Sequence, residues 1–354
     1  MPSHAFTSIP IIDLSLASSP TTRDQLLRQL HHALTSVGFL YVSNHGVPDK
    51  VITDLVHSLP RLFALPPDAK EEIALCNSPH FLGYSSVGAE MTAGKTDRRE
   101  QVEFATELEE RWKPGSGIPL YERLKGPNQW PSHYPALRPI VETYIRELTA
   151  LGERFLLLVA EALSLPSETF FPFLSDQHRL KLVHYPASSE EDTSQGVGPH
   201  KDSSGWWTFL LQASPPEVKG LQALNRHGEW IDVPAIPGTF VVNIGQAFEV
   251  VTNGVCKATV HRVLSGPHDR FSVPFFQGVR GSLTKAEAVE TLKGHFQEHF
   301  QQEDESEEAQ IDSPFLRGKY DTWGESQLRT KIRSHRDVGR KFYADVYDRY
   351  INDD

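Results

Sequence analysis

The sequence has little cysteine and no long apolar run. Its only two cysteines, Cys76 and Cys256, provide neither a disulfide framework nor the ligand spacing of a zinc site. Reduced thiols in a cytosolic protein are the simplest interpretation. No apolar run approaches the roughly 20 residues that span a bilayer. Met1 to Pro10 also lack the basic start and apolar core of a secretory signal. We therefore expect a cytoplasmic protein that does not enter a membrane.

Positive charge is scarce relative to negative charge. Lysine and arginine number 35 against 46 aspartates and glutamates, which gives a formal net charge of -11. Because no segment carries a basic stripe, we expect neither nucleic acid nor an anionic membrane as a partner. Hydrophobic residues make up 39% of the chain, as in ordinary globular proteins. The oligomeric state stays open, with a monomer favoured.

The first part of the chain is expected to mix helices and strands. Short strands are predicted at Ile9–Ile12 and Phe39–Ser43. Between them, apolar residues from Leu26 to Val37 recur at helical spacing, and Gly38 ends that helix. A second long helix is predicted to start at Pro139, a residue that suits a first turn.

The second half of the chain has a different pattern of residues. From about Leu180, short runs rich in valine, phenylalanine, threonine and tryptophan alternate with glycine, proline and asparagine turns. The predicted strands are Leu180–Tyr185, Trp206–Gln212, Glu229–Asp232, Phe240–Ile244, Thr259–Leu264 and Phe271–Phe276, with a hairpin turn at Asn225–Gly228. This pattern indicates an antiparallel sandwich or jelly roll. Glu303–Glu308 is predicted to be a solvated acidic loop, and Gln327–Tyr347 a helical cover.

Three residues of this half could bind one metal ion. Side chains two apart in an extended chain point to the same side, so His200 and Asp202 can converge. His261, in a strand-like apolar run, could supply a third ligand. Two imidazoles and one carboxylate leave three positions open on Fe(II), which suits an ion that binds a co-substrate and dioxygen together. A zinc site would leave one position open.

Neither the His-x-Asp pair nor the lone strand histidine is by itself specific evidence for a metal site. The chain has 16 histidines, so chance His-x-Asp pairs are common. The same pair also fits a turn with a surface histidine and a capping aspartate, since Ser203 and Gly205 follow. A lone strand histidine such as His261 is more often a hydrogen-bonded core residue than a ligand.

A possible carboxylate site follows His261 along the chain. Arg270 and Ser272 share one face of the predicted strand, whereas Phe271 takes the other face. A guanidinium and a hydroxyl side by side can hold a carboxylate through a charge-assisted fork. Alternatively, Arg270 could pair with Asp269 on the surface.

An ordered series of motifs resembles the isopenicillin N synthase-like family of Fe(II)/2-oxoglutarate oxygenases over nearly the whole chain. The motifs are Ile9–Leu14, Gly38–Val47, Leu182–Pro186, Gly198–Asp202, Gly220–Leu224, Trp230–Pro234, Val241–Gly245, Thr259–Val263 and Arg270–Ser272. The ordered set is far more specific than any single motif.

The resemblance implies a fold and a domain arrangement. We expect a mainly β protein with flanking helices, built on a double-stranded β-helix, or jelly-roll, core. An N-terminal α/β region would cover residues 1–165, the jelly roll residues 166–285, and a C-terminal helical extension residues 286–354.

The resemblance also implies a function and roles for individual residues. His200, Asp202 and His261 would be the Fe(II) ligands, and Arg270 and Ser272 would bind the distal carboxylate of 2-oxoglutarate. Tyr185 would lie near that co-substrate, and Asn243, an inward polar residue of the barrel, would also belong to the cofactor-binding residues. With dioxygen, the enzyme would hydroxylate, desaturate or cyclise a small molecule at an unactivated C–H bond. The alternatives are an Fe(II) oxidase of the same fold that does not use 2-oxoglutarate, and a non-catalytic jelly-roll binding protein.

Two positions depart from the family pattern, and one segment bears on the substrate. Lys201 replaces the commoner threonine between the ligands and should point away from the iron, whereas Gln246 stands where aspartate is common. The segment around Glu90 and Thr92 is similar to one in ethylene-forming enzymes that helps to hold an amino acid. These two residues are therefore candidate substrate contacts, or a loop with solvated charges. The substrate could then be amino-acid-derived or a secondary metabolite. Trp206 and Trp207, which are consecutive in the sequence, are predicted to fill the core.

Overall fold

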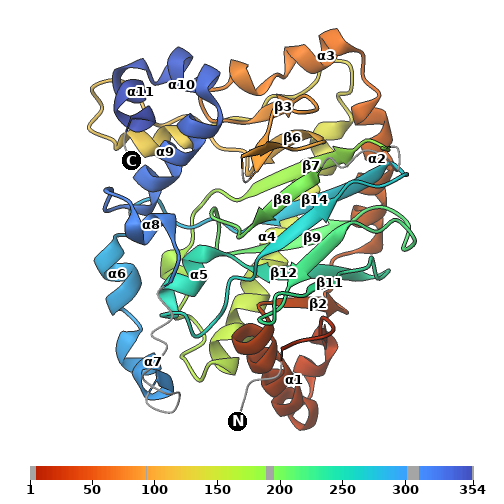
Figure 1. Cartoon of the computed structure of the whole chain (residues 1–354), viewed down its shortest axis with the longest axis vertical. Coiled ribbons are helices and arrows are strands. Elements are labelled where there is room, and N and C mark those ends of the chain that lie inside the picture. The colour runs from red at the N-terminus through yellow and green to blue at the C-terminus, as the bar shows by residue number, and fades with distance from the viewer. Residues whose placement is uncertain (1–4, 93, 189–194, 301–310, 353–354) are drawn as a thin grey trace.

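The core consists of two packed β-sheets, shown in Figure 1. The structure, a computed structural model, describes residues 5–92, 94–188, 195–300 and 311–352. Within these residues, the larger sheet has the strand order β1-β2-β12-β9-β14-β7-β6-β3 and the smaller one β11-β10-β13-β8. Only the β1–β2 pair is parallel among the paired strands of these two sheets. The architecture is the expected jelly roll with flanking helices.

The strands of the larger sheet are β1 (Ile11–Asp13), β2 (Phe39–Ser43), β3 (Gly83–Ser85), β6 (Glu100–Ala105), β7 (Arg179–Tyr185), β9 (Trp207–Gln212), β12 (Thr239–Ile244) and β14 (Arg270–Phe276). The smaller sheet contains β8 (Gln195–His200), β10 (Leu221–Leu224), β11 (Trp230–Asp232) and β13 (His261–Leu264). A separate short hairpin pairs β4 (Met91–Thr92) with β5 (Lys95–Thr96).

Alternation along the strands gives the larger sheet two apolar faces. Phe39 and Tyr41 of β2 pack between the two sheets, whereas Leu40 and Val42 face the helices. Successive side chains of a strand point to opposite faces, so one short apolar run serves both cores. The interior between the sheets is the part of the fold that holds the site described below.

Helices cover the outer face of the larger sheet and one end of the molecule (Figure 1). The covering helices are α1 (Pro20–His32), α2 (Asp49–Phe63) and α4 (Leu137–Ala162). Smaller helices are α3 (Pro67–Glu72), α5 (Gln246–Val251), α6 (Lys285–Glu290), α7 (Lys293–Phe300) and α8 (Pro314–Arg317). At the C-terminal end, α9 (Trp323–Ser334), α10 (Arg336–Phe342) and α11 (Ala344–Ile351) form an apolar cluster with Leu75 and Phe81.

Gly38 marks a tight contact between the N-terminal helix and the smaller sheet. Helix α1 continues as a π-helical turn, Ala33–Val37, and Gly38 follows in a left-handed conformation with φ of 72°. A Cβ atom at this position would lie 2.1 Å from the carbonyl oxygen of Lys257. Thr259 Oγ1 donates to the carbonyl oxygen of Val37 at 2.6 Å. The first helix is therefore fixed against the segment that leads into β13.

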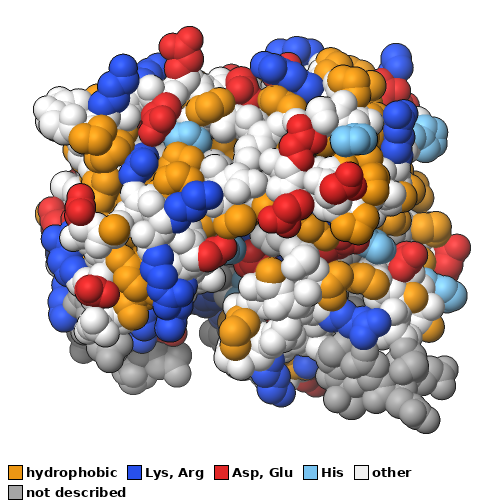
Figure 2. All heavy atoms as spheres, turned by 90° about the horizontal axis from the view of Figure 1, so that it is seen from above, with side chains coloured by type: hydrophobic (Ala, Val, Ile, Leu, Met, Phe, Trp, Pro, Cys, Tyr) orange, Lys and Arg blue, Asp and Glu red, His pale blue; other side chains and the backbone are white. Residues whose placement is uncertain are grey.

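Most predicted strands agree with the structure to within two residues, but several elements differ. The predicted cover at Gln327–Tyr347 is broken into parts of α9, α10 and α11. Strands β6, β8 and β10 were not predicted as strands, and the acidic segment Glu303–Glu308 lies outside the described residues. In the described part of the chain, no helix is long and apolar enough to cross a membrane. Figure 2 shows acidic, basic and apolar side chains scattered over one end of the molecule.

Candidate metal and co-substrate site

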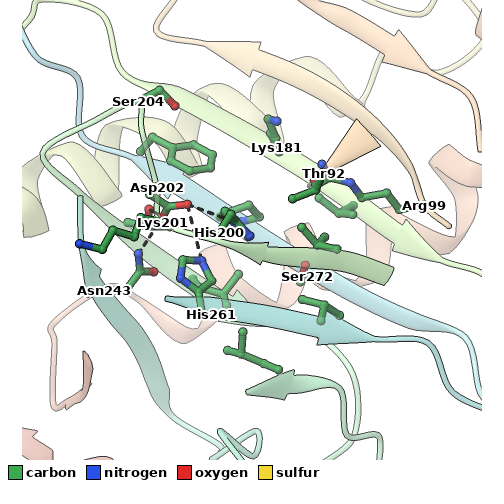
Figure 3. A pocket seen from close by; sticks show the side chains of 18 of the residues that line it. Thr92, Arg99, Lys181, His200, Lys201, Asp202, Ser204, Asn243, His261 and Ser272 are labelled. Carbon is green, nitrogen blue, oxygen red and sulfur yellow. Dashed lines mark hydrogen bonds and ion pairs between the residues drawn. The ribbon is translucent and has the colours of Figure 1, made fainter. Parts of the chain in front are cut away.

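Two adjacent strands and the loop after one of them bring three ligand side chains together. His200 ends β8 and His261 begins β13, and these two residues are direct partners in the antiparallel ladder. Asp202 follows two residues after β8. Its Oδ1 lies 3.5 Å from His200 Nε2 and 3.6 Å from His261 Nε2. Figure 3 shows the three side chains pointing toward one another. They form the only such metal-ligand cluster among the described residues.

Hydrogen bonds at Nδ1 leave the Nε2 atom of each histidine directed toward the point where the three candidate ligands converge. His200 Nδ1 contacts the carbonyl oxygen of Gly198 at 2.8 Å, and His261 Nδ1 contacts that of Thr259 at 3.1 Å. Because a carbonyl oxygen only accepts, both contacts place a proton on Nδ1, which leaves Nε2 of the neutral ring to bind a metal. The three residues thus fit a divalent metal bound on one face.

The carboxylate ligand is held by two donors from neighbouring strands. Asp202 Oδ2 accepts from Thr208 Oγ1 at 2.5 Å and from Asn243 Nδ2 at 2.7 Å. Its carbonyl oxygen accepts from the backbone N–H of Gln246 at 2.9 Å. Only Oδ1 remains for a metal. A metal bound through one oxygen by this side chain leaves room for further ligands.

The electrostatics of the three residues match a cation site. Burial would raise the pKa of Asp202, but the two imidazoles outweigh burial and hold that pKa well below its usual range. Burial and the neighbouring His261 lower the pKa of His200. Burial would lower the pKa of His261, but Asp202 outweighs burial and raises it. The largely buried carboxylate therefore stays ionised, and a metal cation would satisfy a charge that is mostly removed from water.

A cavity of about 210 Å³ lies between the two sheets beside these ligands. A single water needs only roughly 10–15 Å³ measured in the same way, so small organic molecules fit here. Its lining includes each of the three ligands, Tyr185, Asn243, Arg270 and Ser272.

Arg270 and Ser272 lie side by side on β14 and face this cavity. Arg270 is opposite Tyr185 and Ser272 is opposite Val183 in the ladder with β7. The Arg270 guanidinium lies 5.1 Å from the centre of the Tyr185 ring. Phe271, on the other face, packs against Phe63. The predicted division of the strand into two faces agrees with this arrangement, and Arg270 is a buried residue, not a surface partner of Asp269.

The buried guanidinium of Arg270 has spare donors. Its Nη2 donates to Gln212 Oε1 at 3.0 Å, whereas Nη1 is buried without a hydrogen-bond partner among the described residues. Burial lowers the pKa of Arg270. Gly220 leaves space beside it, since a Cβ there would lie 3.3 Å from Arg270 Cδ. A buried donor without a partner is costly, so this site fits an anionic oxygen of a bound molecule.

The structure separates the two candidate substrate contacts. Thr92 lines the cavity, and its hydroxyl donates to Asp97 Oδ2 at 2.7 Å. Glu90 is not among the lining residues. It accepts from Gln101 Nε2 at 3.1 Å and lies 3.6 Å from His335 Nε2.

The two residues that depart from the family pattern, Lys201 and Gln246, each form hydrogen bonds in the structure. Lys201 donates to both carboxylate oxygens of Glu249, at 3.0 and 3.2 Å, and points away from the ligand cluster, as expected (Figure 3). Glu249 Oε1 also accepts from the backbone N–H of Ala258 at 3.1 Å. The side chain of Gln246 donates to the carbonyl oxygen of Asp312 at 3.0 Å. Lys201 and Glu249 thus connect the segment that carries two ligands with the one that leads to His261.

Helix α9 lies beside the cavity without lining it. Gln327 Nε2 donates to the carbonyl oxygen of Ser203 at 2.8 Å, and Lys331 Nζ donates to Glu103 at 2.8 Å. The helical cover predicted for this region thus reaches the rim of the cavity, but no α9 residue is among the lining residues described. Trp206 and Trp207 are fully buried in the apolar core, as predicted.

The sequence interpretation missed several residues of the site. Thr208 was within a predicted strand, and a polar residue on the inward face of an apolar strand is the signal that could have revealed it. Lys181 and Arg99 also line the cavity, and Glu249 was not singled out. Their positions depend on strand pairings distant in sequence, so spacing alone gives no indication of them.

Two family models match most of the chain. Residues 9–133 match the model described as non-haem dioxygenase in morphine synthesis N-terminal, and residues 177–279 match the 2OG-Fe(II) oxygenase superfamily.

Individual relatives are similar along much of their length. A 2-oxoglutarate-dependent dioxygenase, frbJ, of Dothideomycetidae sp. is 42% identical, covering 96% of this chain and 92% of the relative. A homoarginine-6-hydroxylase of Oryza sativa subsp. japonica is 31% identical, covering 77% and 85%. The crystal structure of JOX2 in complex with 2OG, Fe and JA is 28% identical, with a TM-score of 0.64, and the match covers 78% and 76%.

Proposed function

Because the chain belongs to the Fe(II)- and 2-oxoglutarate-dependent dioxygenases, we propose that His200, Asp202 and His261 bind its iron and that Arg270 and Ser272 bind the distal carboxylate of 2-oxoglutarate. The observation that carries this proposal is the convergence of two imidazoles and one carboxylate next to a buried guanidinium with an unused donor. Relatives named for 2-oxoglutarate favour this enzyme over an oxidase without that co-substrate and over a binding protein.

Iron held by His200, Asp202 and His261 would supply dioxygen activation, coupled to oxidative decarboxylation of 2-oxoglutarate to succinate, for oxidation of a C–H bond in the substrate. The side chains of this protein position the reactants and limit access of water. Asn243 and Thr208 orient Asp202, so that one oxygen faces the metal. Asn243 would therefore orient the metal ligand Asp202. This role differs from the expected one, in which Asn243 contacts the co-substrate. The Tyr185 ring supports the Arg270 guanidinium.

The substrate is proposed to be a small amino-acid-derived compound. The homoarginine-6-hydroxylases and the 1-aminocyclopropane-1-carboxylate oxidases among the relatives are named for amino acids. Thr92 lines the cavity and could contact such a substrate directly. Glu90, which lies next to Gln101 and His335, would then contribute through the charge that it places near the cavity.

Alanine substitution of each ligand tests the iron assignment. His200→Ala, Asp202→Ala and His261→Ala should each abolish formation of succinate and reduce bound iron, because each removes one ligand of three. Asp202→Glu should also fail, since its carboxylate would shift by about one methylene group. His227→Ala is a matched control, because His227 is exposed at a hairpin turn. Native iron content in any one ligand variant would remove that residue from the site.

A further inference from the structure

Two cations of the cavity wall have donor atoms without a hydrogen-bond partner among the described residues. Lys181 and Arg99 both line the cavity, together with Thr92 (Figure 3). Lys181 Nζ has no hydrogen-bond partner among the described residues, and its paired carboxylate oxygen, Glu103 Oε2, lies 3.9 Å away. Arg99 Nη2 donates to Asp97 at 3.2 Å, but Arg99 Nε is buried without a partner in the described structure.

The nearby carboxylates are already occupied by other donors. Glu103 accepts from Arg179 Nη1 at 2.5 Å and from Lys331 Nζ at 2.8 Å. Glu103 is thus shared by three cations, of which Lys181 is the most distant. Burial and then the charges of Arg179 and Lys181 outweigh the attraction of Glu103 and lower the pKa of Lys331 to about 8. Burial would raise the pKa of the nearby Glu90, but the charges of Lys181, His335 and Arg99 outweigh burial and lower it. Even with Glu90 counted beside Glu103 and Asp97, the four cations Lys181, Arg99, Arg179 and Lys331 exceed the three carboxylates by one charge.

Asp97 pairs with Arg99 but is shared with other donors, and it makes no contact with Lys181, the cation in excess. Its Oδ2 accepts from Thr92 Oγ1 at 2.7 Å as well as from Arg99, and its Oδ1 accepts from Gln195 Nε2 at 3.1 Å. The Asp97 side chain is fully buried, so its charge serves the loop that it holds together. A cation out of water without its own counter-ion is unfavourable unless a ligand provides one.

We propose that Lys181 and Arg99 form a second anion subsite in the cavity, which binds a carboxylate of the prime substrate. The subsite is separate from Arg270 and Ser272, which the co-substrate occupies. It rests on the proposed function, because it assigns the remaining part of the same cavity to the substrate. A lysine and an arginine on one wall together bind a carboxylate through charge-assisted hydrogen bonds. The class of substrate is thereby narrowed to organic acids, including amino acids with a free carboxylate.

The competing explanation is that Lys181 has a structural role as a partner of Glu103, and thermal stability distinguishes the two. Lys181→Met removes a surplus cation, so Tm should stay the same or rise. Lys331→Met removes a hydrogen-bonded partner of the buried Glu103, so Tm should fall by several degrees. An equal fall in Tm for Lys181→Met would overturn the proposal.

Binding is measured on the anaerobic Fe(II) and 2-oxoglutarate complex. The probes are L-homoarginine, L-arginine and 1-aminocyclopropane-1-carboxylate, each compared with its primary amide. The tightest acid should bind at least about tenfold more tightly than its amide, because the amide loses a charge-assisted contact. Lys181→Met and Arg99→Gln should each abolish most of this preference. Lys219→Met, which removes an exposed lysine, is the control that should retain it.

Crystals of the same complex soaked in sodium bromide locate the subsite independently of substrate identity. We expect an anomalous bromide peak in contact with Lys181 and Arg99 in the wild type and no peak there in Lys181→Met. No wild-type peak would overturn the proposal. A peak without any acid preference in the titrations means an adventitious ion only, and would also overturn it. Absence of 2-oxoglutarate from Arg270 in these crystals would instead contradict the proposed function.

Discussion

At the scale of single residues, the ligands are positioned mainly by contacts within a few residues. Each histidine bonds through Nδ1 to a carbonyl oxygen two residues earlier, so the local strand geometry selects its tautomer. The aspartate is different, because Asn243 lies 41 residues away along the chain. That amide and Thr208 Oγ1 together determine which oxygen of Asp202 remains free.

Loss of the Asn243 amide should weaken iron binding without removing a ligand. We expect Asn243→Ala to raise the dissociation constant for Fe(II) by about 10- to 100-fold, as for other residues that orient metal ligands. Thr208→Val, which removes the other donor while retaining the shape of the side chain, should act in the same direction. Anaerobic competition with a chelator measures both constants, and Asn77→Ala, at an exposed position, is the control. Unchanged affinity in both variants would show that Asp202 is held by other means.

Five residues that the structure brings together at the candidate site could be singled out from sequence, whereas the residues around them could not. His200, Asp202, His261, Arg270 and Ser272 belong to short motifs whose spacing within a strand is visible in the chain. Lys181 faces the cavity because β7 pairs with β6 and β14 at a particular register. Such register is fixed by long-range packing and turn geometry, and a shift by one residue would reverse the face.

At the scale of elements, the apolar pattern identified most strands but missed those with polar sequences. Strand β6, Glu100–Ala105, carries two glutamates yet is buried at every position. These glutamates are neutralised by cations of other elements, including Lys70 of α3 and Lys331 of α9. Alternating hydrophobicity cannot reveal a strand whose buried charges have partners far away in sequence. Strand β8 was missed for a related reason, because its glycines and proline resemble a turn.

The junction between the N-terminal helix and the smaller sheet should tolerate no side chain at Gly38. Gly38→Ala places a Cβ in a left-handed conformation against the carbonyl oxygen of Lys257. The conformational cost of about 1–2 kcal/mol adds to steric strain of about 1–3 kcal/mol. We expect a loss of roughly 2–5 kcal/mol in the free energy of unfolding, measured by urea denaturation.

A matched glycine gives the control for this substitution. Gly228→Ala, at the β10–β11 turn, has a similar positive φ but no atom within 4 Å of the added Cβ. In this control variant, the free energy of unfolding should fall only by the conformational cost of about 1–2 kcal/mol. If both variants lose the same amount, Gly38 is required for its dihedral angles alone and not for close approach to the segment before His261.

At the scale of the whole molecule, buried carboxylates make stability depend on pH. Burial alone would raise the pKa of Glu100, but hydrogen bonds from His184, Lys70 and Tyr84 outweigh burial and lower that pKa to about 2. A carboxylate with a depressed pKa in the folded state stabilises that state above its ordinary value of 4.5. This stabilisation is lost as the pH falls from 4.5 to about 2.

Acid denaturation should therefore be less steep when Glu100 cannot ionise. Between pH 5 and pH 2, the free energy of unfolding of the wild type should fall by roughly 1–3 kcal/mol more than that of Glu100→Gln. The control is Glu290→Gln, at an exposed residue of α6. Parallel pH profiles of wild type and Glu100→Gln, measured by urea denaturation at each pH, would assign the acid sensitivity to other groups.

The surface gives an expectation for assembly as well. Among the large apolar side chains exposed in the described residues, Val87 and Met91 are four residues apart, whereas Ile11, Leu157 and Leu264 belong to separate segments. Scattered apolar groups are ordinary on monomeric proteins, whereas stable interfaces usually gather them into a patch. We expect a monomer of 39.8 kDa by light scattering coupled to size-exclusion chromatography. A dimer at micromolar concentration would contradict this expectation.

Titration of the anaerobic Fe(II) enzyme with 2-oxoglutarate tests the account most directly, because metal-to-ligand charge-transfer absorption reports both groups in one site. Arg270→Ala should raise the dissociation constant about tenfold to a hundredfold, since it removes a charge-assisted contact of roughly 1.5–3 kcal/mol. Arg270→Lys keeps the charge without the planar fork and should be intermediate. Ser272→Ala should cost only about 0.5–1.5 kcal/mol, with iron content unchanged in all three variants. Absence of the band in the wild type, or wild-type affinity in Arg270→Ala, would contradict the assignment of this site.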